Sequence, residues 1–469
     1  MELEENKMGV MPVNKLLINM SLPIIVSMLI QALYNVVDSI FVAQINEKAL
    51  TAVSLAFPLQ NLMVAIAVGT GVGINALLSR SLGEKNFKES NLAANNGVFL
   101  AFISYLVFFV LGLFFIKLYF ELQTNDAEII KYGIDYMSIC TTASIGVFGQ
   151  ITIEKLLTST GKTFLSMITQ GVGAIINIIL DPILIFGLLG MPEMGVAGAA
   201  LATVLGQIIA FITAIILNAK FNREIKLQFK GFRPNLNTIK KIYSVGFPSI
   251  IMLSITSVTT YCLNNILMKF TSTATAVFGI YFKLQSFAFM PIFGINNGMV
   301  PIVSYNYGAN NKNRLMETIK LSIKYAVAIM LLALVVFQSV PQYLLSLFNA
   351  SEDMLRLGVP ALRIISLSYI FAGFSVVAGS VFQALGNGLL SLMVSVGRQL
   401  VILIPAAYLL SFTNNVNMVW WSYPIAEIAS VILSVIFLKY IYNSRINSII
   451  ETNDNCYINL ENAVNDEVM

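Results

Sequence analysis

Long apolar segments are the feature of this sequence that most restricts its fold. Twelve of them follow one another along the 469 residues. Each is long enough to cross a hydrocarbon layer of about 30 Å as an α-helix. Only 11% of the residues are charged, against about 25% in a soluble domain. The segments do not alternate in polarity as barrel strands do, so the sequence predicts an all-α polytopic membrane protein with twelve transmembrane helices.

The two halves of the chain repeat one another at a constant difference in residue number. Pro23 of the first half, for example, corresponds to Pro248 of the second. The other pairs that recur at this separation include Gly69 and Gly294, Gly73 and Gly298, Gly83 and Gly308, and Gly161 and Gly386. Each half holds six spans, an even number, so the second half enters the membrane from the same side as the first. We therefore expect two six-helix bundles related by a parallel internal repeat, with the axis along the membrane normal.

Polar stretches mark the expected domains. These are an N-terminal tail (1–15), a first six-helix lobe (16–219), a linker (220–240), a second six-helix lobe (241–442) and a C-terminal tail (443–469). Lysine and arginine gather in the loops on one side, above all in the linker. The positive-inside rule then predicts that both tails and the linker are cytoplasmic and that the protein spans the cell membrane.

Several function classes are excluded or disfavoured by composition. The chain has no histidine, which rules out zinc–histidine sites and histidine-based triads. No nucleophile motif is present, so we assign no catalytic residue and expect no enzyme. The net charge of +4 comes without a basic–aromatic patch, so we expect no nucleic-acid partner. The odd number of cysteines, Cys140, Cys262 and Cys456, is typical of free thiols.

Two segments carry a resemblance to a known family: LPIIVSMLIQALYNVVDSIFV (22–42) and FMPIFGINNGMVPIVSYNYGANN (289–311). With the twofold six-helix layout, they resemble the multidrug and toxic compound extrusion (MATE) family of the wider flippase-exporter superfamily, over nearly all of residues 10–445. The resemblance implies a cation-driven exporter of organic, mostly cationic compounds, including antibiotics, whose lobes alternate between outward and inward openings. We expect it to act as a monomer in the lipid bilayer, with no cofactor besides a coupling ion, H⁺ or Na⁺.

Two aspartates interrupt the apolar spans of the first half, Asp38 and Asp181. An aspartate at the centre of a membrane helix costs about 2.5 to 3.5 kcal/mol, so it persists mainly where it faces protein or water. At the equivalent positions of the repeat, the second half has Leu263 and Ala406 instead. The scaffold is duplicated and the acid pair is not, which favours a functional role over a purely structural one.

Other polar residues fall on the same helix faces as these aspartates. Spacings of three, four and seven residues place side chains on one face of a helix. The residues that follow this spacing are Gln31, Tyr34 and Asn35 with Asp38, Asn177 with Asp181, and Thr203 with Gln207. Pro182 directly follows Asp181, and its ring displaces the carbonyl of Ile178, which predicts a helix kink that either exposes this carbonyl or only shapes the bundle.

If the polar faces of these three helices are turned toward one another, they form a polar pocket, and the sequence predicts such a pocket. Two carboxylates in a medium of low dielectric constant repel one another, so the pair is expected to hold a proton or a small cation. The family resemblance implies a cation-coupling site at Asp38, Asn177, Asp181 and Thr203, with Na⁺ at Asp38 and Asp181 as one possibility. A purely structural polar cluster is the alternative. A second branch of the family uses carboxylates in the seventh and tenth helices, and 242–269 and 364–385 contain none.

Three charges lie in apolar spans of the second half: Lys283, Arg398 and Glu427. Because buried membrane charges usually pair, we expect a structural ion pair between Glu427 and either Arg398 or Lys283. Glu154 and Lys155 lie in the fourth predicted helix, and the sequence gives them no role.

Three other functions compete with cation-coupled export. A flippase for lipid-linked oligosaccharides or lipids is the nearest, but its cavity would hold several basic residues for pyrophosphate, and few lie at mid-membrane depth here. A channel is commonly built around a repeated constriction, whereas the two lobes carry unequal polar sites. An intramembrane enzyme lacks a recognisable nucleophile.

Overall fold

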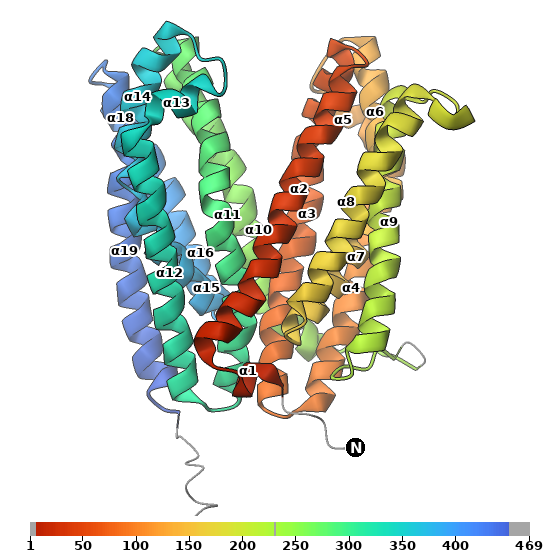
Figure 1. The fold of residues 1–469 in the computed structure, drawn as a ribbon, viewed down its shortest axis with the longest axis vertical. Coiled ribbons are helices and arrows are strands. Elements are labelled where there is room, and N and C mark those ends of the chain that lie inside the picture. Colours follow the sequence, from red (N-terminus) through yellow and green to blue (C-terminus); the bar gives the residue numbers. More distant parts are fainter. Residues whose placement is uncertain (1–5, 229–230, 450–469) are drawn as a thin grey trace, which may run out of the picture.

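The protein is a bundle of long helices. In a computed structural model, residues 6–228 and 231–449 are described, and this part of the chain contains no strand (Figure 1). Within it, ten helices are long and apolar enough to cross a membrane, or twelve if each of two bent pairs is one span. The all-α, twelve-span architecture is therefore confirmed. Residues 450–469, which include Cys456 and most of the predicted C-terminal tail, lie outside the described residues.

The helices divide into two sets. The first set is α1 (Lys7–Val10), α2 (Val13–Ala43), α3 (Glu47–Gly83), α4 (Phe87–Phe114), α5 (Ile116–Glu121), α6 (Ala127–Thr142), α7 (Ile145–Ser159), α8 (Thr163–Phe186), the short 3₁₀ turn η1 (Leu188–Gly190) and α9 (Gly195–Phe221). The second set is α10 (Leu236–Met268), α11 (Ser272–Gly308), α12 (Lys312–Ser339), α13 (Pro341–Ser346), α14 (Glu352–Ser366), α15 (Tyr369–Ala384), α16 (Gly388–Val396), the π-helical η2 (Gly397–Leu403), α17 (Ile404–Ser411), α18 (Val416–Trp420), α19 (Ser422–Ile441) and the π-helical η3 (Tyr442–Ile446).

The fourth and tenth spans are bent, whereas the sequence predicts continuous helices over 129–159 and 354–385. The bend between α6 and α7 is 45°, and that between α14 and α15 is 50°. Hydroxyl groups beside both breaks bond to the backbone: Thr142 Oγ1 donates to the carbonyl of Ser138, and Ser368 Oγ donates to that of Ile365. Such bonds compete with the helical ladder and bend helices.

The internal repeat is visible in both packing and hydrogen bonds. The helices α3 and α11 have the same length and begin at equivalent positions of the repeat. Gly69 packs against Ile250, and its counterpart Gly294 packs against Ile25, the counterpart of Ile250. Glycine at these positions lets helix backbones from the two lobes approach closely. Ser79 Oγ donates to the Ser159 carbonyl at 2.9 Å, and the equivalent Ser304 Oγ donates to that of Ala384 at 2.8 Å.

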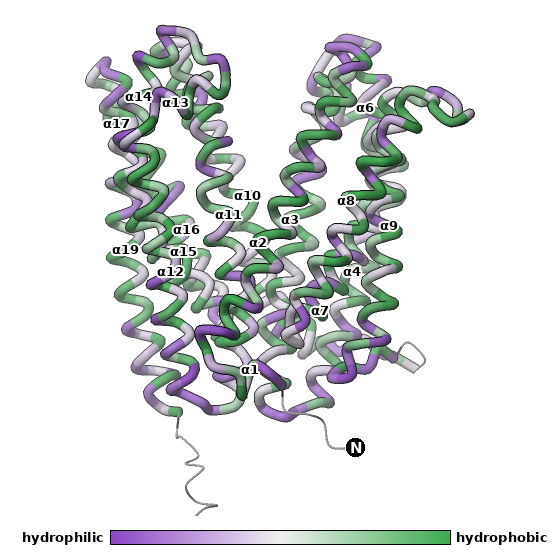
Figure 2. Tube along the Cα trace, viewed as in Figure 1, coloured by the Kyte–Doolittle hydropathy of each residue, from purple (hydrophilic) through white to green (hydrophobic). Residues whose placement is uncertain are grey.

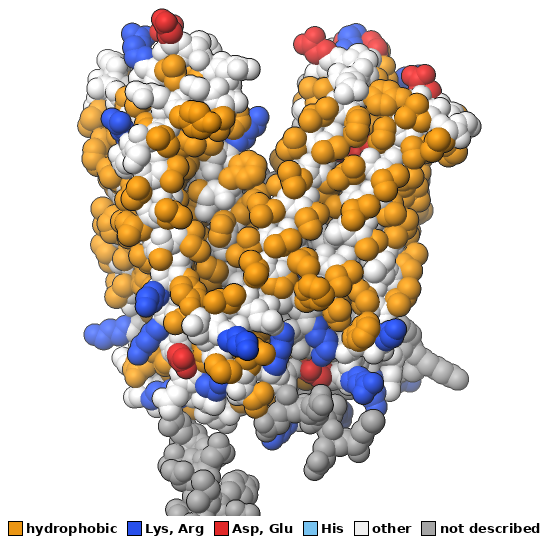
Figure 3. Space-filling model, viewed as in Figure 1, with side chains coloured by type: hydrophobic (Ala, Val, Ile, Leu, Met, Phe, Trp, Pro, Cys, Tyr) orange, Lys and Arg blue, Asp and Glu red, His pale blue; other side chains and the backbone are white. Residues whose placement is uncertain are grey.

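The two lobes form a V (Figure 1). They separate at one end of the molecule, here named the open end, and meet at the other, the closed end, where α1 lies. Apolar residues dominate the middle of the helices, and hydrophilic residues gather toward both ends (Figure 2). The space-filling view shows a hollow between the lobes at the open end, an apolar outer belt, and lysine and arginine side chains gathered at the closed end (Figure 3).

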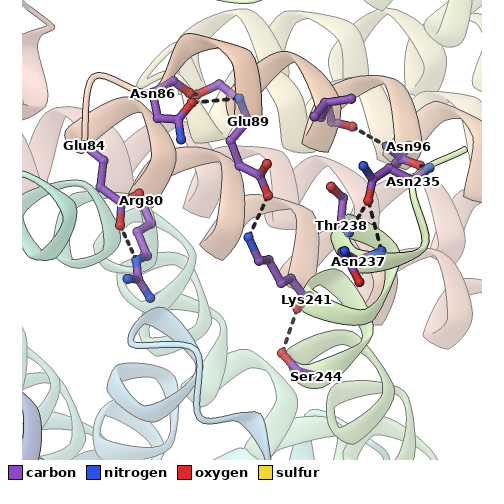
Figure 4. Close-up of polar contacts among 12 residues, drawn as sticks. Arg80, Glu84, Asn86, Glu89, Asn96, Asn235, Asn237, Thr238, Lys241 and Ser244 are labelled. Carbon is purple, nitrogen blue, oxygen red and sulfur yellow. Dashed lines mark hydrogen bonds and ion pairs between the residues drawn. The ribbon is translucent and has the colours of Figure 1, made fainter. Parts of the chain in front are cut away.

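Polar contacts join the lobes at the closed end (Figure 4). Lys241 Nζ on α10 donates to Glu89 Oε1 on α4 at 3.0 Å. The backbone N–H of Asn235 donates to Asn96 Oδ1 at 2.9 Å, and the Asn235 side chain caps the first turn of α10 by accepting from Thr238 N–H. The start of the second lobe is thus fixed directly against α4 of the first.

The short helix α1 also contacts both lobes. Asn6 Nδ2, at its start, donates to the Thr160 carbonyl at the end of the first lobe's bent span. Met8 is fully buried, and its carbonyl accepts from Asn306 Nδ2 and Arg314 Nη2 of the second lobe, each at 3.1 Å. This segment therefore closes the V at its narrow end.

Candidate functional site

Three helices of the first lobe bring the predicted polar faces together. The helix α8 packs against both α2 and α9. A cavity of about 270 Å³ lies among them and α7. Its lining includes five of the residues predicted from the sequence: Gln31, Tyr34, Asn177, Thr203 and Gln207. Asp38 and Asp181, the two carboxylates expected to line the pocket, are not among the lining residues, so the cation-coupling site stays a prediction.

Asn177 links α8 to α9 at the edge of this cavity. Its Nδ2 donates to Asp181 Oδ1 at 3.3 Å, one turn along the same helix, and to Thr203 Oγ1 at 3.4 Å on α9. The exposed fractions are 3% for Asn177 and 0% for Asp181. The amide thus uses its two donors on these two partners, and its own oxygen faces away from both.

Asp181 interacts electrostatically with Asp38 of α2, and among the described residues no hydrogen bond joins Asp38 to Asn177, Asp181 or Thr203. Asp38, Asn177 and Asp181 are together called the polar cluster. Three oxygens of this cluster, Asp38 Oδ1, Asp181 Oδ2 and Asn177 Oδ1, are buried and have no hydrogen-bond donor among the described residues. A buried polar atom without a partner is costly, and a buried charge more so. An acceptor set of this kind fits a proton or a hard cation, since both bind oxygen ligands.

The cluster does not fit a tightly held transition metal. Among residues 6–228 and 231–449, no group of three or more His, Cys, Asp or Glu side chains is placed to hold a metal ion. Two carboxylates with an amide oxygen and a hydroxyl suit a monovalent cation or a proton, so exchange rather than permanent binding is the chemistry that this arrangement supports.

The structure adds residues that the sequence did not single out. Tyr136 and Cys140 of α6 are buried in the same lobe, and both lie within hydrogen-bond distance of Gln60. Gln60 Nε2 of α3 donates to Tyr136 Oη at 3.0 Å and holds this side chain in place. Tyr136 and Cys140 are four residues apart and therefore share a helix face. This spacing is the sequence feature from which they could have been predicted.

One predicted member, Asn35, differs from expectation, and the kink at Pro182 stays a prediction. Asn35 is exposed and does not line the cavity, so it does not belong to the supporting stripe of α2. It lies one residue beyond Tyr34, which is enough to turn its side chain outward. Pro182 lies within α8, which runs without a break from Thr163 to Phe186.

Glu154 and Lys155 of α7 line the same cavity. Glu154 Oε1 accepts from Gln150 Nε2 at 3.0 Å and from Thr169 Oγ1 at 2.9 Å. Lys155 points the other way, and its Nζ donates to Asn297 Oδ1 of α11 at 2.9 Å. Lys155 therefore ties the first lobe to the second, while Glu154 remains a carboxylate of the cavity wall.

The expected ion pair of the second lobe involves Arg398. Its Nη1 donates to Glu427 Oε1 at 2.6 Å. Lys283 is the wrong alternative: it is exposed, and its Nζ lies 6.0 Å from the centre of the Phe348 ring. Lys283 can reach solvent from its position in α11, so it needs no buried partner.

Comparison with known proteins gives consistent similarities. The MatE family profile matches residues 23–183 and 248–409. Multidrug export protein MepA of Staphylococcus haemolyticus (strain JCSC1435) is 28% identical over 92% of this chain and 94% of its own. The protein of that name from Staphylococcus aureus (strain MSSA476) is 25% identical, over 93% and 95% respectively.

Solved structures share the fold. A multidrug resistance MATE family transporter of the MOP superfamily, in an outward-facing conformation, superposes with a TM-score of 0.87 and 24% identity, covering 95% of this chain and 99% of that one. A MATE structure in complex with MaL6 gives a TM-score of 0.87 at 23% identity, with the same coverage.

Proposed function

Because this chain belongs to the MatE family, whose profile matches both of its halves, we propose that it exports a range of organic compounds by antiport with H⁺ or Na⁺. Membership makes it a multi-pass membrane transport protein. The relatives named as multidrug export proteins support a broad range of substrates. The coupling ion and the mechanism are the parts that we propose.

One observation carries the coupling proposal: the three buried oxygens of Asp38, Asn177 and Asp181 that have no donor among the described residues. A bound cation or proton would offset the repulsion between the two carboxylates and satisfy these oxygens. Its release would restore the repulsion. The free energy of the cluster therefore depends on cation binding, and two lobe arrangements that expose it to opposite sides would differ in cation affinity.

The cation gradient is large enough to drive such a cycle. One charge that crosses a potential of 100 mV is worth about 2.3 kcal/mol. At about 1.4 kcal/mol per factor of ten, this shifts a two-state equilibrium by more than tenfold. Cation binding from the open end would favour one arrangement, and substrate binding would favour the other.

Organic cations are the substrates that the first-lobe cavity favours. Glu154 lines it, and Asp38 and Asp181 lie beside it, against the single cation Lys155, which is already bonded to Asn297. We place the closed end in the cytoplasm because lysine and arginine gather there (Figure 3). Both termini would then be cytoplasmic, in a monomer of the cell membrane without catalytic activity or a nucleic-acid partner.

A lipid flippase has no comparable support. The basic residues that line the first-lobe cavity and the two second-lobe cavities described below are Lys155 and Arg398. Each already has a partner on the neighbouring helices. A pyrophosphate would need several unengaged basic groups in one cavity.

Efflux from proteoliposomes tests the proposal. The purified protein is reconstituted with a fluorescent organic cation inside, and a pH gradient or a sodium gradient is imposed separately. We expect one of the two gradients to accelerate efflux, and the ion that does so is the coupling ion. Equal efflux under both gradients and under none would contradict coupled antiport.

A further inference from the structure

The second lobe contains a cavity of its own. One chamber of about 300 Å³ is lined by residues of α10, α11, α15, α16, η2 and α19, with Val68, Val72 and Asn75 of α3. A second chamber of about 240 Å³ adjoins it. Both are lined by Thr256, Phe293, Val376, Arg398 and Gln399, so the two chambers meet at Arg398. The proposed export mechanism assigns no role to this space.

Arg398 reaches the cavity from an irregular segment. It lies on the π-helical segment Gly397–Leu403, whereas residues 172–178 at the equivalent position of the first lobe continue the regular helix α8. Single π-helical turns are rare and occur frequently at functional sites. A cation at mid-membrane depth is also uncommon unless it faces protein or water. The local backbone of this lobe is thus modified at the residue that carries the charge.

The guanidinium of Arg398 is only partly engaged. Its Nη1 donates to Glu427 Oε1, and within the described chain no other hydrogen bond of Arg398 is found. A guanidinium has five N–H groups in one plane. The Arg398 side chain is 27% exposed, against 8% for Glu427. Glu427 is therefore the more buried partner, and Arg398 is the one that lines both chambers while partly exposed.

The rest of the lining is uncharged, and both chambers mix polar and apolar side chains. Hydroxyl and amide groups line the first chamber: Ser249, Asn296, Ser375, Gln383, Ser391 and Gln399. Aromatic rings line the second: Phe278, Phe282, Phe289, Phe293 and Tyr423. Among the described residues, Glu427 is the one carboxylate that lines either chamber. The cavity therefore presents a partly engaged cation near hydrogen-bonding groups of both chambers and near the aromatic rings of the second.

We propose that this cavity is a second binding site, for aromatic compounds that carry a carboxylate. The carboxylate accepts hydrogen bonds from the unengaged N–H groups of Arg398, in the planar geometry that guanidinium and carboxylate share. The ring system lies against the phenylalanines of the second chamber. Because Glu427 partly neutralises Arg398, the site holds small inorganic anions weakly and needs the aromatic part for affinity. This proposal goes beyond the coupled antiport of organic cations and does not rest on it.

Binding without an ion gradient tests the proposal. The protein in lipid nanodiscs is titrated with dansyl-glycine and with its methyl ester, and binding to empty nanodiscs is subtracted. We expect the wild-type protein to prefer the acid. In the double variant Arg398→Gln/Glu427→Gln, which keeps a neutral pair of similar size, the preference for the acid falls about tenfold or more, as expected when a charge-assisted hydrogen bond is lost. The affinity for the ester stays the same.

Two further variants separate recognition from a structural role. Glu427→Gln alone leaves Arg398 unneutralised and raises the preference for the acid. Lys283→Gln removes an exposed positive charge of the same lobe that lines neither chamber, and it leaves the preference unchanged. Equal wild-type affinity for acid and ester, an unchanged preference in the double variant, or an equal loss of both ligands would overturn the proposal.

Discussion

The two lobes share a scaffold and differ in their polar chemistry. At equivalent positions, α8 of the first lobe carries Asn177 and Asp181, and the second lobe has Ile402 and Ala406. The second lobe instead places Arg398 on a π-helical segment. The glycines that allow the lobes to touch are repeated in both halves, because backbone contact leaves no space for a side chain. The cavities face no such restriction, so their chemistry has diverged.

The difference lies in whether a charge has a partner. In the first lobe two carboxylates share a cluster in which three buried oxygens have no donor within the described part of the chain. In the second lobe Glu427 Oε2 also lacks a donor within the described part of the chain, but Glu427 Oε1 has the cation Arg398 at 2.6 Å. We infer that the first lobe responds to the concentration of a cation, and that the second lobe does not.

Removing either carboxylate of the first lobe should give the largest effect. Asp38→Asn and Asp181→Asn are each expected to reduce ion-driven efflux by at least about a hundredfold, because each removes a charge that only the coupling ion neutralises. Efflux from proteoliposomes under the driving gradient measures this. The exposed Asp353, which pairs with Arg356, supplies a matched control: Asp353→Asn should transport normally. Normal efflux by both Asp38 and Asp181 variants would remove the distinction between the lobes.

The ion pair of the second lobe should affect stability. Arg398→Gln leaves Glu427, which is 8% exposed, without its cation, and removing one partner of a buried pair costs about 3 to 5 kcal/mol. The double variant Arg398→Gln/Glu427→Gln should recover most of this loss. Thermal unfolding in detergent distinguishes the three proteins. Equal melting temperatures for the single and double variants would show that the pair is not coupled.

Much of the fold could be predicted because two of its properties can be read in the sequence: the length of the apolar segments and the internal repeat. The constant separation between matching residues showed which helices correspond, and the helical periodicity placed Asn177 beside Asp181. Contacts between helices that are distant in the sequence cannot be read in this way. Tyr136 of α6 accepts a hydrogen bond from Gln60 of α3, and the contact between Lys155 and Asn297 joins residues of different lobes. The sequence leaves Arg398 and Lys283 as alternative partners of Glu427, because the exposure of Lys283 depends on the surroundings of α11.

The scaffold predicts equal effects from equivalent glycines. A Cβ on Gly83 would collide with the carbonyl of Tyr305, and one on Gly308 with the carbonyl of Arg80. These backbone atoms cannot move aside cheaply, so Gly83→Ala and Gly308→Ala should open the closed end to a similar extent. Accessibility of an introduced cysteine at the closed end measures the change. Gly171→Ala, where nothing lies within 4 Å of the added atom, is the control. A large effect from only one of the pair would contradict the symmetry.

The contacts of α1 should have the smallest effect. Deleting residues 1–11 removes the hydrogen bonds that Asn6 and Met8 make to the two lobes. Each hydrogen bond contributes about 1 kcal/mol or less, and Glu89 and Lys241 still join the lobes there. The deletion should therefore raise the population with an open narrow end by less than the glycine substitutions do. The same cysteine-accessibility assay measures it. An unchanged accessibility would show that α1 does not contribute to closure.

The central claim is that the first lobe binds the coupling cation and the second does not. Calorimetric titration of the purified protein with Na⁺, and measurement of proton uptake across a pH range at constant Na⁺, test this directly. We predict one Na⁺ or one additional titrating proton per molecule. The signal should disappear in Asp181→Asn and persist in Arg398→Gln/Glu427→Gln. A signal that survives Asp181→Asn and is lost in the second-lobe variant would contradict the account.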